Sequence, residues 1–168
     1  MVACKGFTLA VVGYLVKDNQ IILGLRKKVS LELGKGLISG IGGKLDLIDK
    51  DRLEDPDSAL IREFKEEVKV VPTKFYQRGE LYFIYPYKTE WNQRVFAYLI
   101  EDWSGSPTET EVIKPVQYKI DEIPFTRMWP DNRYYLLDIL QNKKVYGKFI
   151  YGSDNKTVVK VDLKIDVV

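Results

Sequence analysis

An α/β (α+β) fold, with a mixed β-sheet core packed between α-helices, is predicted by three observations. The chain has 168 residues, a length that suits one globular domain spanning residues 1–168. Hydrophobic residues make up 45% of it and charged residues 30%, as in folded globular proteins. Segments with helix-capping residues alternate with runs rich in aromatic and branched side chains, so we expect helices packed on a sheet.

The first half of the chain predicts a β-hairpin, a loop and a helix. Two apolar runs, Phe7–Val16 and Gln20–Leu25, flank the turn-forming pair Asp18-Asn19. Residues 27–40 show no sustained hydrophobic period and predict a loop. A helix is expected over residues 56–69, because Asp55 can cap it and Pro56 suits its first position.

The second half predicts two strand pairs with a helix between them. The runs at residues 74–87 and 94–103 are rich in aromatic and branched residues and are separated by a turn at residues 88–92. Residues 131–142 follow a proline and predict a helix. The runs Val145–Tyr151 and Thr157–Leu163 predict a closing hairpin.

The composition excludes several chemistries and partners. The chain has no His, which excludes imidazole bases and His-ligated zinc, and its single Cys4 excludes disulfide frameworks. A net charge of +2 gives no general attraction to duplex nucleic acid. The longest apolar stretch is about half of what a bilayer requires, and no cleavage site follows it. We therefore expect a cytoplasmic monomer that binds no membrane, with Cys4 as an inert thiol.

Three acidic residues share one face of the helix predicted after Asp55. At about 100° per residue, Glu63, Glu66 and Glu67 fall together, beside an apolar face that can pack. Crowded carboxylates repel one another unless solvent or a cation intervenes. Such hard oxygen ligands suit Mg²⁺ or Mn²⁺, whereas the simpler alternative is a solvated acidic face.

The sequence around this helix contains a spaced motif. Gly40-Ile41-Gly42-Gly43-Lys44 comes first, and Glu54 stands eight positions before Arg62-Glu63-Phe64-Lys65-Glu66-Glu67-Val68-Lys69-Val70. This resembles the Nudix box, which reads Gly, five residues, Glu, seven residues, then Arg-Glu-apolar-x-Glu-Glu-x-Gly-apolar. Lys69 replaces the last Gly, so we expect the helix to lack a left-handed cap. Ten residues rather than five separate Gly43 from Glu54, and we expect a longer surface loop there.

The resemblance implies the Nudix fold and hydrolysis of nucleoside diphosphates linked to another group, with Mg²⁺ or Mn²⁺ as cofactor. It implies that Glu63, Glu67 and the carbonyl of Gly42 bind the metal, and that Glu66 is a further ligand or the base. It also implies that Glu54 and Arg62 form an ion pair that orients the acids. Two cations, Arg26 and Lys44, are candidate phosphate contacts.

The likeness continues outside the box over nearly the whole chain. It is carried by Phe7-Thr8-Leu9, Gly79-Glu80-Leu81-Tyr82-Phe83 and the segment Ile123–Asp131, which ends in Met-Trp-Pro-Asp before a helix. These segments look like the mammalian MutT homologues, the 8-oxo-dGTP diphosphatases. The resemblance implies that Trp129 stacks on a purine, that Asp131 bonds the base edge, and that Thr8 and Phe83 line the base pocket.

Three positions depart from that subgroup. Asn132 replaces a second Asp, so Asp131 and Asn132 cannot titrate as a pair of carboxylates. Ser39 stands at the place of a base-reading Asn and has a different bonding pattern. Val112 stands at the place of a late acidic metal ligand, for which Glu111 is the nearest substitute.

The leading hypothesis is Mg²⁺-dependent hydrolysis of an oxidised purine (deoxy)nucleoside triphosphate, such as 8-oxo-dGTP, to the monophosphate and pyrophosphate. One alternative is a Nudix hydrolase for another nucleotide: a methylated purine nucleotide, a nucleotide sugar or a capped RNA. The other alternative is a module that binds nucleotide without hydrolysing it. The complete set Glu54, Glu63, Glu66 and Glu67 argues against the last alternative.

Overall fold

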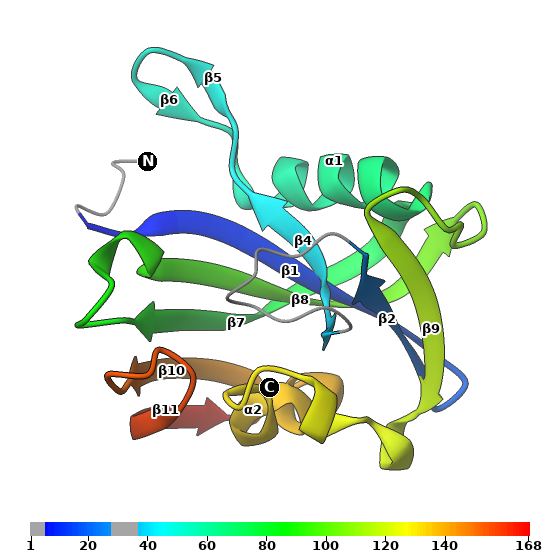
Figure 1. The fold of residues 1–168 in the computed structure, drawn as a ribbon. Coiled ribbons are helices and arrows are strands. Elements are labelled where there is room, and N and C mark those ends of the chain that lie inside the picture. The colour runs from blue at the N-terminus through cyan, green and yellow to red at the C-terminus, as the bar shows by residue number, and fades with distance from the viewer. Residues whose placement is uncertain (1–5, 28–36) are drawn as a thin grey trace.

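A mixed sheet forms the middle layer of the computed structural model, which describes residues 6–27 and 37–168 (Figure 1). Within these residues nine strands run in the order β11-β10-β7-β8-β1-β2-β3, while β4 also pairs with β1 and β9 with β2. The strands are β1 (Thr8–Lys17), β2 (Gln20–Arg26), β3 (Ile38–Ser39), β4 (Ile41–Lys44), β7 (Val71–Ile84), β8 (Gln93–Ser104), β9 (Ile113–Lys119), β10 (Lys144–Tyr151) and β11 (Val158–Asp166).

Two α-helices cover opposite faces of this sheet, and the core is divided accordingly (Figure 1). Helix α1 (Pro56–Val68) packs Leu60 and Phe64 into a cluster with β1 and β8. Helix α2 (Asn132–Leu140) packs Leu136 and Ile139 into the cluster on the other face. The predicted fold class, a mixed sheet between helices, is therefore confirmed.

Strand β1 positions the Nudix-box segment. It runs parallel to β8 and antiparallel to both β2 and β4, and in the last pairing Val11 lies opposite Gly43 and Val12 opposite Gly42. The predicted hairpin is confirmed, because Asp18 and Asn19 form the turn between β1 and β2 with φ of 53° and 60°. Two positive φ values in succession match the right-handed twist of the paired strands.

Helix α1 begins and ends with definite caps. The Asp55 carboxylate accepts hydrogen bonds from the Ser58 N–H at 2.9 Å and the Ser58 hydroxyl at 2.8 Å, as the sequence predicted. At the other end Lys69 has φ of 62°, and its N–H donates to the Phe64 carbonyl. The expected loss of the left-handed cap is thus wrong. Burial of Val70 directly after the turn fixes the chain path, so Lys69 adopts this conformation although it has a Cβ.

The segment before α1, which was expected to be a surface loop, forms a short hairpin instead. Residues 44–53 contain a two-stranded hairpin, β5 (Leu47–Asp49) with β6 (Arg52–Leu53), which projects from the body of the molecule (Figure 1). The short 3-10 helices are η1 (Thr89–Trp91), η2 (Ile120–Glu122) and η3 (Phe125–Arg127).

The predicted loop at residues 27–40 is described only in part. The loop is interrupted by β3, while its residues 28–36, like Cys4, lie outside the described residues. In the described part of the chain, no helix has both the length and the hydropathy needed to cross a membrane.

Candidate active site

The acidic face of α1 packs against β4. Glu63 is 8% exposed and lies directly over Gly43: a Cβ placed on Gly43 would lie 2.3 Å from Glu63 Oε1. The neighbouring Gly42 N–H donates a hydrogen bond to the Glu67 carboxylate. The close approach of this helix to β4 therefore requires glycine, and it places two carboxylates beside the backbone of one strand.

A single guanidinium organises the start of this face. Arg62 Nε donates to both oxygens of Glu54 at 3.1 Å, and Nη2 makes a further short contact with the same carboxylate. Arg62 Nη2 also donates to the Lys44 carbonyl at 3.0 Å, and Nε lies 3.2 Å from Asp46 Oδ2. The structure thus brings the predicted pair Glu54 and Arg62 together, and it adds Asp46, which the sequence did not indicate.

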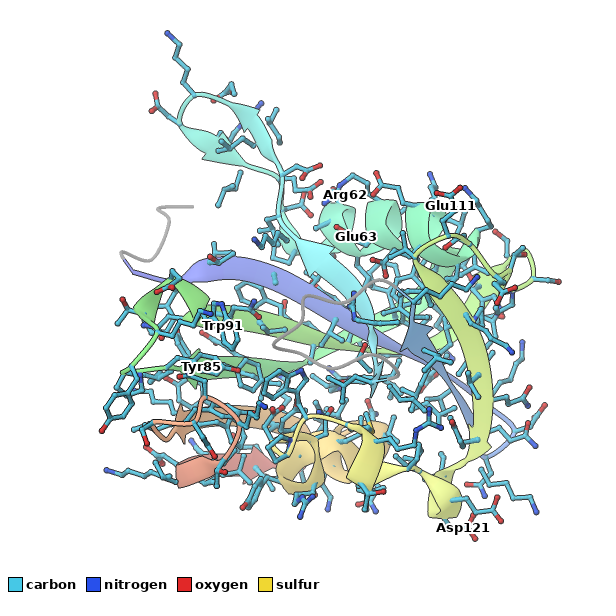
Figure 2. The ribbon with its side chains drawn as sticks, in the orientation of Figure 1. Arg62, Glu63, Tyr85, Trp91, Glu111 and Asp121 are labelled. Atoms are coloured by element: carbon cyan, nitrogen blue, oxygen red, sulfur yellow. The ribbon has the colours of Figure 1, made fainter. Side chains whose placement is uncertain are left out.

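The remaining Arg62 nitrogen reaches the acids of the helix. Arg62 Nη1 lies 3.0 Å from Glu63 Oε1, and both side chains are labelled on α1 in Figure 2. The same nitrogen lies 3.2 Å from Glu66 Oε2. The Glu66 side chain is 60% exposed, so one of its oxygens faces solvent. Arg62 therefore fixes the positions of a buried and an exposed carboxylate at the same time.

The electrostatics of the acids differ according to burial. Hydrogen bonds from Arg62 hold the pKa of Glu54 below its ordinary value. Burial raises the pKa of Glu63 in spite of Arg62. Burial also raises the pKa of Glu67 to about 7; the charge of Arg26 opposes this rise and that of Glu63 adds to it.

One oxygen of this face has no partner. Glu67 Oε2 is buried and accepts no hydrogen bond, a costly state for a carboxylate oxygen. A divalent cation is the natural neighbour for such an oxygen, so Glu67 and the adjacent Glu63 fit a hard metal ion. Among the described residues no three acidic side chains already converge as a complete ligand set, since Arg62 holds Glu63 and Glu66.

Glu111, the candidate for the late acidic metal ligand, lies near the far end of α1. Figure 2 shows Glu111 beyond the end of the helix opposite Arg62. The loop is attached there by Thr110, whose hydroxyl donates to the Glu67 carbonyl at 2.9 Å. Both Glu111 and Val112 are exposed.

Three of the residues predicted to contact the base, Trp129, Asp131 and Asn132, lie at the start of α2. Trp129 is half-buried and meets the ring of Tyr151 edge-on, with centroids 5.8 Å apart. Asn132 Nδ2 donates to the Trp129 carbonyl at 3.0 Å. The buried Asp131 accepts hydrogen bonds from the hydroxyls of Tyr135, at 2.7 Å, and Tyr151.

The chain was compared with known proteins, and no family model matches it. The oxidized purine nucleoside triphosphate hydrolase of Mus musculus is 28% identical over 158 residues, covering 94% of this chain and 93% of the mouse protein. The protein of the same name from Danio rerio is 29% identical over 168 residues, covering 100% and 98%. The crystal structure of the mMutator MutT protein from Bacillus halodurans superposes with a TM-score of 0.78 at 17% identity, covering 94% and 97%.

The chain has the Nudix fold of the MutT proteins. The predicted resemblance is confirmed, and the relatives are named as hydrolases, in agreement with the predicted class of enzyme. In this chain the box residues lie on the α1 face of the sheet. Phe83 belongs to the core cluster on the α2 face, where it stacks on Phe149 at 5.6 Å, and the partly buried Trp129 packs against that cluster.

Arg26 interacts with one predicted base-contacting residue and with one predicted metal ligand. Its Nε donates to the Ser39 hydroxyl at 3.2 Å, and its charge acts on Glu67. Lys44, by contrast, contributes its carbonyl to Arg62 and exposes its side chain. Thr8, at the start of β1, lines a hollow of about 630 Å³ next to Asn92.

Sequence reasoning did not find the tyrosines that surround Asp131. Tyr135 and Tyr151 lie in segments predicted as a helix and a strand, where aromatic residues are ordinary core residues. A signal was available, because the hydroxyl of a buried Tyr needs a hydrogen-bond partner.

Proposed function

We propose that the chain hydrolyses an oxidised purine (deoxy)nucleoside triphosphate, such as 8-oxo-dGTP, to the monophosphate and pyrophosphate, and so removes damaged nucleotides from the pool. The names of its full-length relatives support the substrate class. The observation that carries the chemistry is the buried, unpartnered oxygen of Glu67 beside Glu63.

Mg²⁺ is the proposed cofactor, and Mn²⁺ is expected to replace it. The residues that would hold it are Glu63 and Glu67, the carbonyl of Gly42 and, from the loop before β9, Glu111. Glu66, predicted as a further ligand or the base, is assigned here as the base. When bound, such a cation neutralises phosphate charge and makes a bound water more acidic.

The side chains Glu54, Arg62 and Glu66 have separate roles in this proposal. Glu54 fixes Arg62, and Arg62 holds Glu63 and Glu66 in place through its Nη1. Since Glu66 Oε2 is occupied by Arg62, the solvent-facing Oε1 is the atom that takes the proton from the attacking water. A base with one fixed and one free oxygen is oriented without being blocked.

The nucleotide is bound by residues from both faces of the sheet. Arg26, which lies near Glu67 and Ser39, contacts a phosphate, and the exposed Lys44 adds a second positive charge. The base stacks on Trp129, which is worth roughly 1–3 kcal/mol. Polar contacts to the base are assigned to Asp131, Asn132 and Ser39, and the lining of its pocket to Thr8 and Phe83.

The test compares Glu66→Gln with Glu122→Gln, an exposed glutamate on η2 that serves as a matched control. Both variants and the wild type are incubated with Mg²⁺ and a panel of normal, 8-oxo and methylated purine triphosphates, a nucleotide sugar and a capped RNA. We expect Glu66→Gln to remain folded and lose turnover while Glu122→Gln stays active. A fully active Glu66→Gln contradicts the assigned base. Turnover of another class in the panel contradicts the substrate, and no turnover by the wild type favours a binding module.

A further inference from the structure

Strand β11 lies at one end of the sheet and has an open edge. It pairs with β10 on one side, and no described strand lies on its other side (Figure 1). Its residues are half-buried or exposed, and none is fully buried. The N–H and C=O groups along such an edge can pair with another strand.

The features that usually block a sheet edge are missing from most of β11. At the other end of the strand order β3 has only two residues, and β9, which pairs with β2 alone among the described strands, contains Pro115. Strand β11 has nine residues without proline or glycine. Its pairing with β10 is irregular only near its start, opposite Ile150 and Tyr151, so residues 160–166 form a regular strand.

Charged and apolar residues alternate along residues 160–166. Val161 and Leu163 pack against the core cluster on the α2 face, so the charged residues between them point to the opposite face. The charges alternate in sign along that face, in the order Lys160, Asp162, Lys164 and Asp166. The edge therefore has no net charge that would repel a second strand.

These charges are only partly compensated within one copy of the chain. Lys164 Nζ lies 3.8 Å from Asp166 Oδ2, and the two side chains are 74% and 60% exposed. Lys160 and Asp162 form no ion pair with any residue that the structure describes. Strand β10 places Lys148 opposite Asp162, but the outer side of each charge on β11 remains open.

The regular part of β11 is complementary to itself. If a second copy runs antiparallel with Leu163 opposite Leu163, charges meet opposite charges and apolar residues meet apolar residues throughout: Lys160 and Asp166, Val161 and Ile165, Asp162 and Lys164. Sliding the second copy by two residues would bring like charges opposite each other. Sliding it by one residue would oppose charged and apolar residues. The sequence of the strand therefore favours one register, and Leu163 is also the midpoint of the regular part.

We propose that β11 pairs with β11 of a second copy of this chain, antiparallel and centred on Leu163, so that two sheets join into one. The same edge is used on both copies, so the assembly closes at two. Strands β10, β7 and β8 separate β11 from β1, so the acidic face of α1 stays open and the proposal does not depend on the proposed function. The sequence alone predicted a monomer, because the place of β11 at an edge is defined only by the assembled sheet.

The experiment measures dimerisation by sedimentation equilibrium over a series of concentrations, with circular dichroism as the check on folding. The variants are Asp162→Lys, Lys164→Asp and the double variant that carries both changes. In a homodimer each single variant places like charges opposite each other twice, whereas the double variant restores opposite charges. An equimolar mixture of the two single variants also restores them, because one copy is then positive at both positions and the other negative. Lys156→Asp is the matched control, since this exposed lysine lies outside the regular strand.

We expect the wild type and Lys156→Asp to dimerise equally, and each single variant to dimerise about tenfold or more weakly. The mixture and the double variant should regain the affinity of the wild type. If one single variant does not fold, the other single variant and the double variant provide the comparison. A wild type that stays monomeric at every concentration overturns the inference. A dimer that the single variants leave unchanged, or that neither the mixture nor the double variant restores, overturns it as well, because the contact then lies elsewhere or has another register.

Discussion

Replacement of Gly43 by alanine should lower the activity while leaving the stability nearly unchanged. An alanine Cβ would lie 2.3 Å from Glu63 Oε1 and 2.5 Å from its Cδ, far closer than the ordinary contact distance. Because the atoms it meets are the end of a flexible side chain, the strand can stay in place while the Glu63 carboxylate moves by about 1 Å. A displacement of that size at a reacting site costs about 10²-fold in rate. We therefore expect kcat of Gly43→Ala to fall about 10²-fold, with stability within about 1 kcal/mol of the wild type.

The adjacent glycine provides the contrast. A Cβ on Gly42 would lie 2.0 Å from the Val11 carbonyl oxygen, which belongs to the backbone of β1. Gly42→Ala should therefore disrupt the pairing of β1 with β4 and cost about 3 kcal/mol or more. Urea denaturation and steady-state turnover of 8-oxo-dGTP measure the two effects. A fully active Gly43→Ala, or a Gly43→Ala as unstable as Gly42→Ala, would show that Gly43 is not needed specifically to position the Glu63 carboxylate.

Three further predictions follow from single contacts. Lys69→Gly should stabilise the protein by about 0.5–1 kcal/mol in urea denaturation, because glycine removes the strain at a φ of 62°; a destabilised variant would show that the cap is not strained. Asp55→Ala should cost about 1 kcal/mol at neutral pH. Hydrogen bonds from Ser58 hold the pKa of Asp55 below its ordinary value of 3.8, so this contribution is present above pH 3.8 and is lost as pH falls below it; a pH-independent cost would contradict the cap. Trp129→Ala should raise KM at least about tenfold with a smaller change in kcat, and an unchanged KM would exclude base stacking.

The sequence was sufficient for the elements that have strong local signals. Helix α1 was predicted to within one residue at its end, because Asp55 and Pro56 mark its start and the apolar spacing marks its packed face. The contact between Glu54 and Arg62 was also predicted, although only from the resemblance to the Nudix box, since the two residues lie on different elements. A spacing of eight positions carries no such information by itself.

Other elements had no local signal. Strand β9 contains Pro115, which argues against a strand in sequence, but β9 pairs with β2 alone and tolerates the missing donor. The β5–β6 hairpin exposes Leu47 and Ile48, so no pattern of burial marks its strands. The base of the hairpin is closed by a backbone hydrogen bond, in which the Glu54 N–H donates to the Asp46 carbonyl at 2.9 Å.

The candidate site was incompletely predicted for the same reason. The acids of α1 are visible as a stripe on one helix, whereas the tyrosines around Asp131 come from segments far apart in the chain. Tyr135 fits an ordinary helix pattern and Tyr151 an ordinary strand pattern, and only the assembled fold brings their hydroxyls to one carboxylate. Long-range convergence of this kind depends on topology, which the residue pattern alone did not define.

The proposed function is hydrolysis of a purine triphosphate between its α- and β-phosphates at this acidic face. The most direct test is to incubate the purified protein with Mg²⁺ and 8-oxo-dGTP, separate the products by ion exchange and identify them. We expect 8-oxo-dGMP and pyrophosphate in equal amounts, and none of either when the metal is chelated. Release of 8-oxo-dGDP and inorganic phosphate, or equal turnover with and without metal, would contradict it.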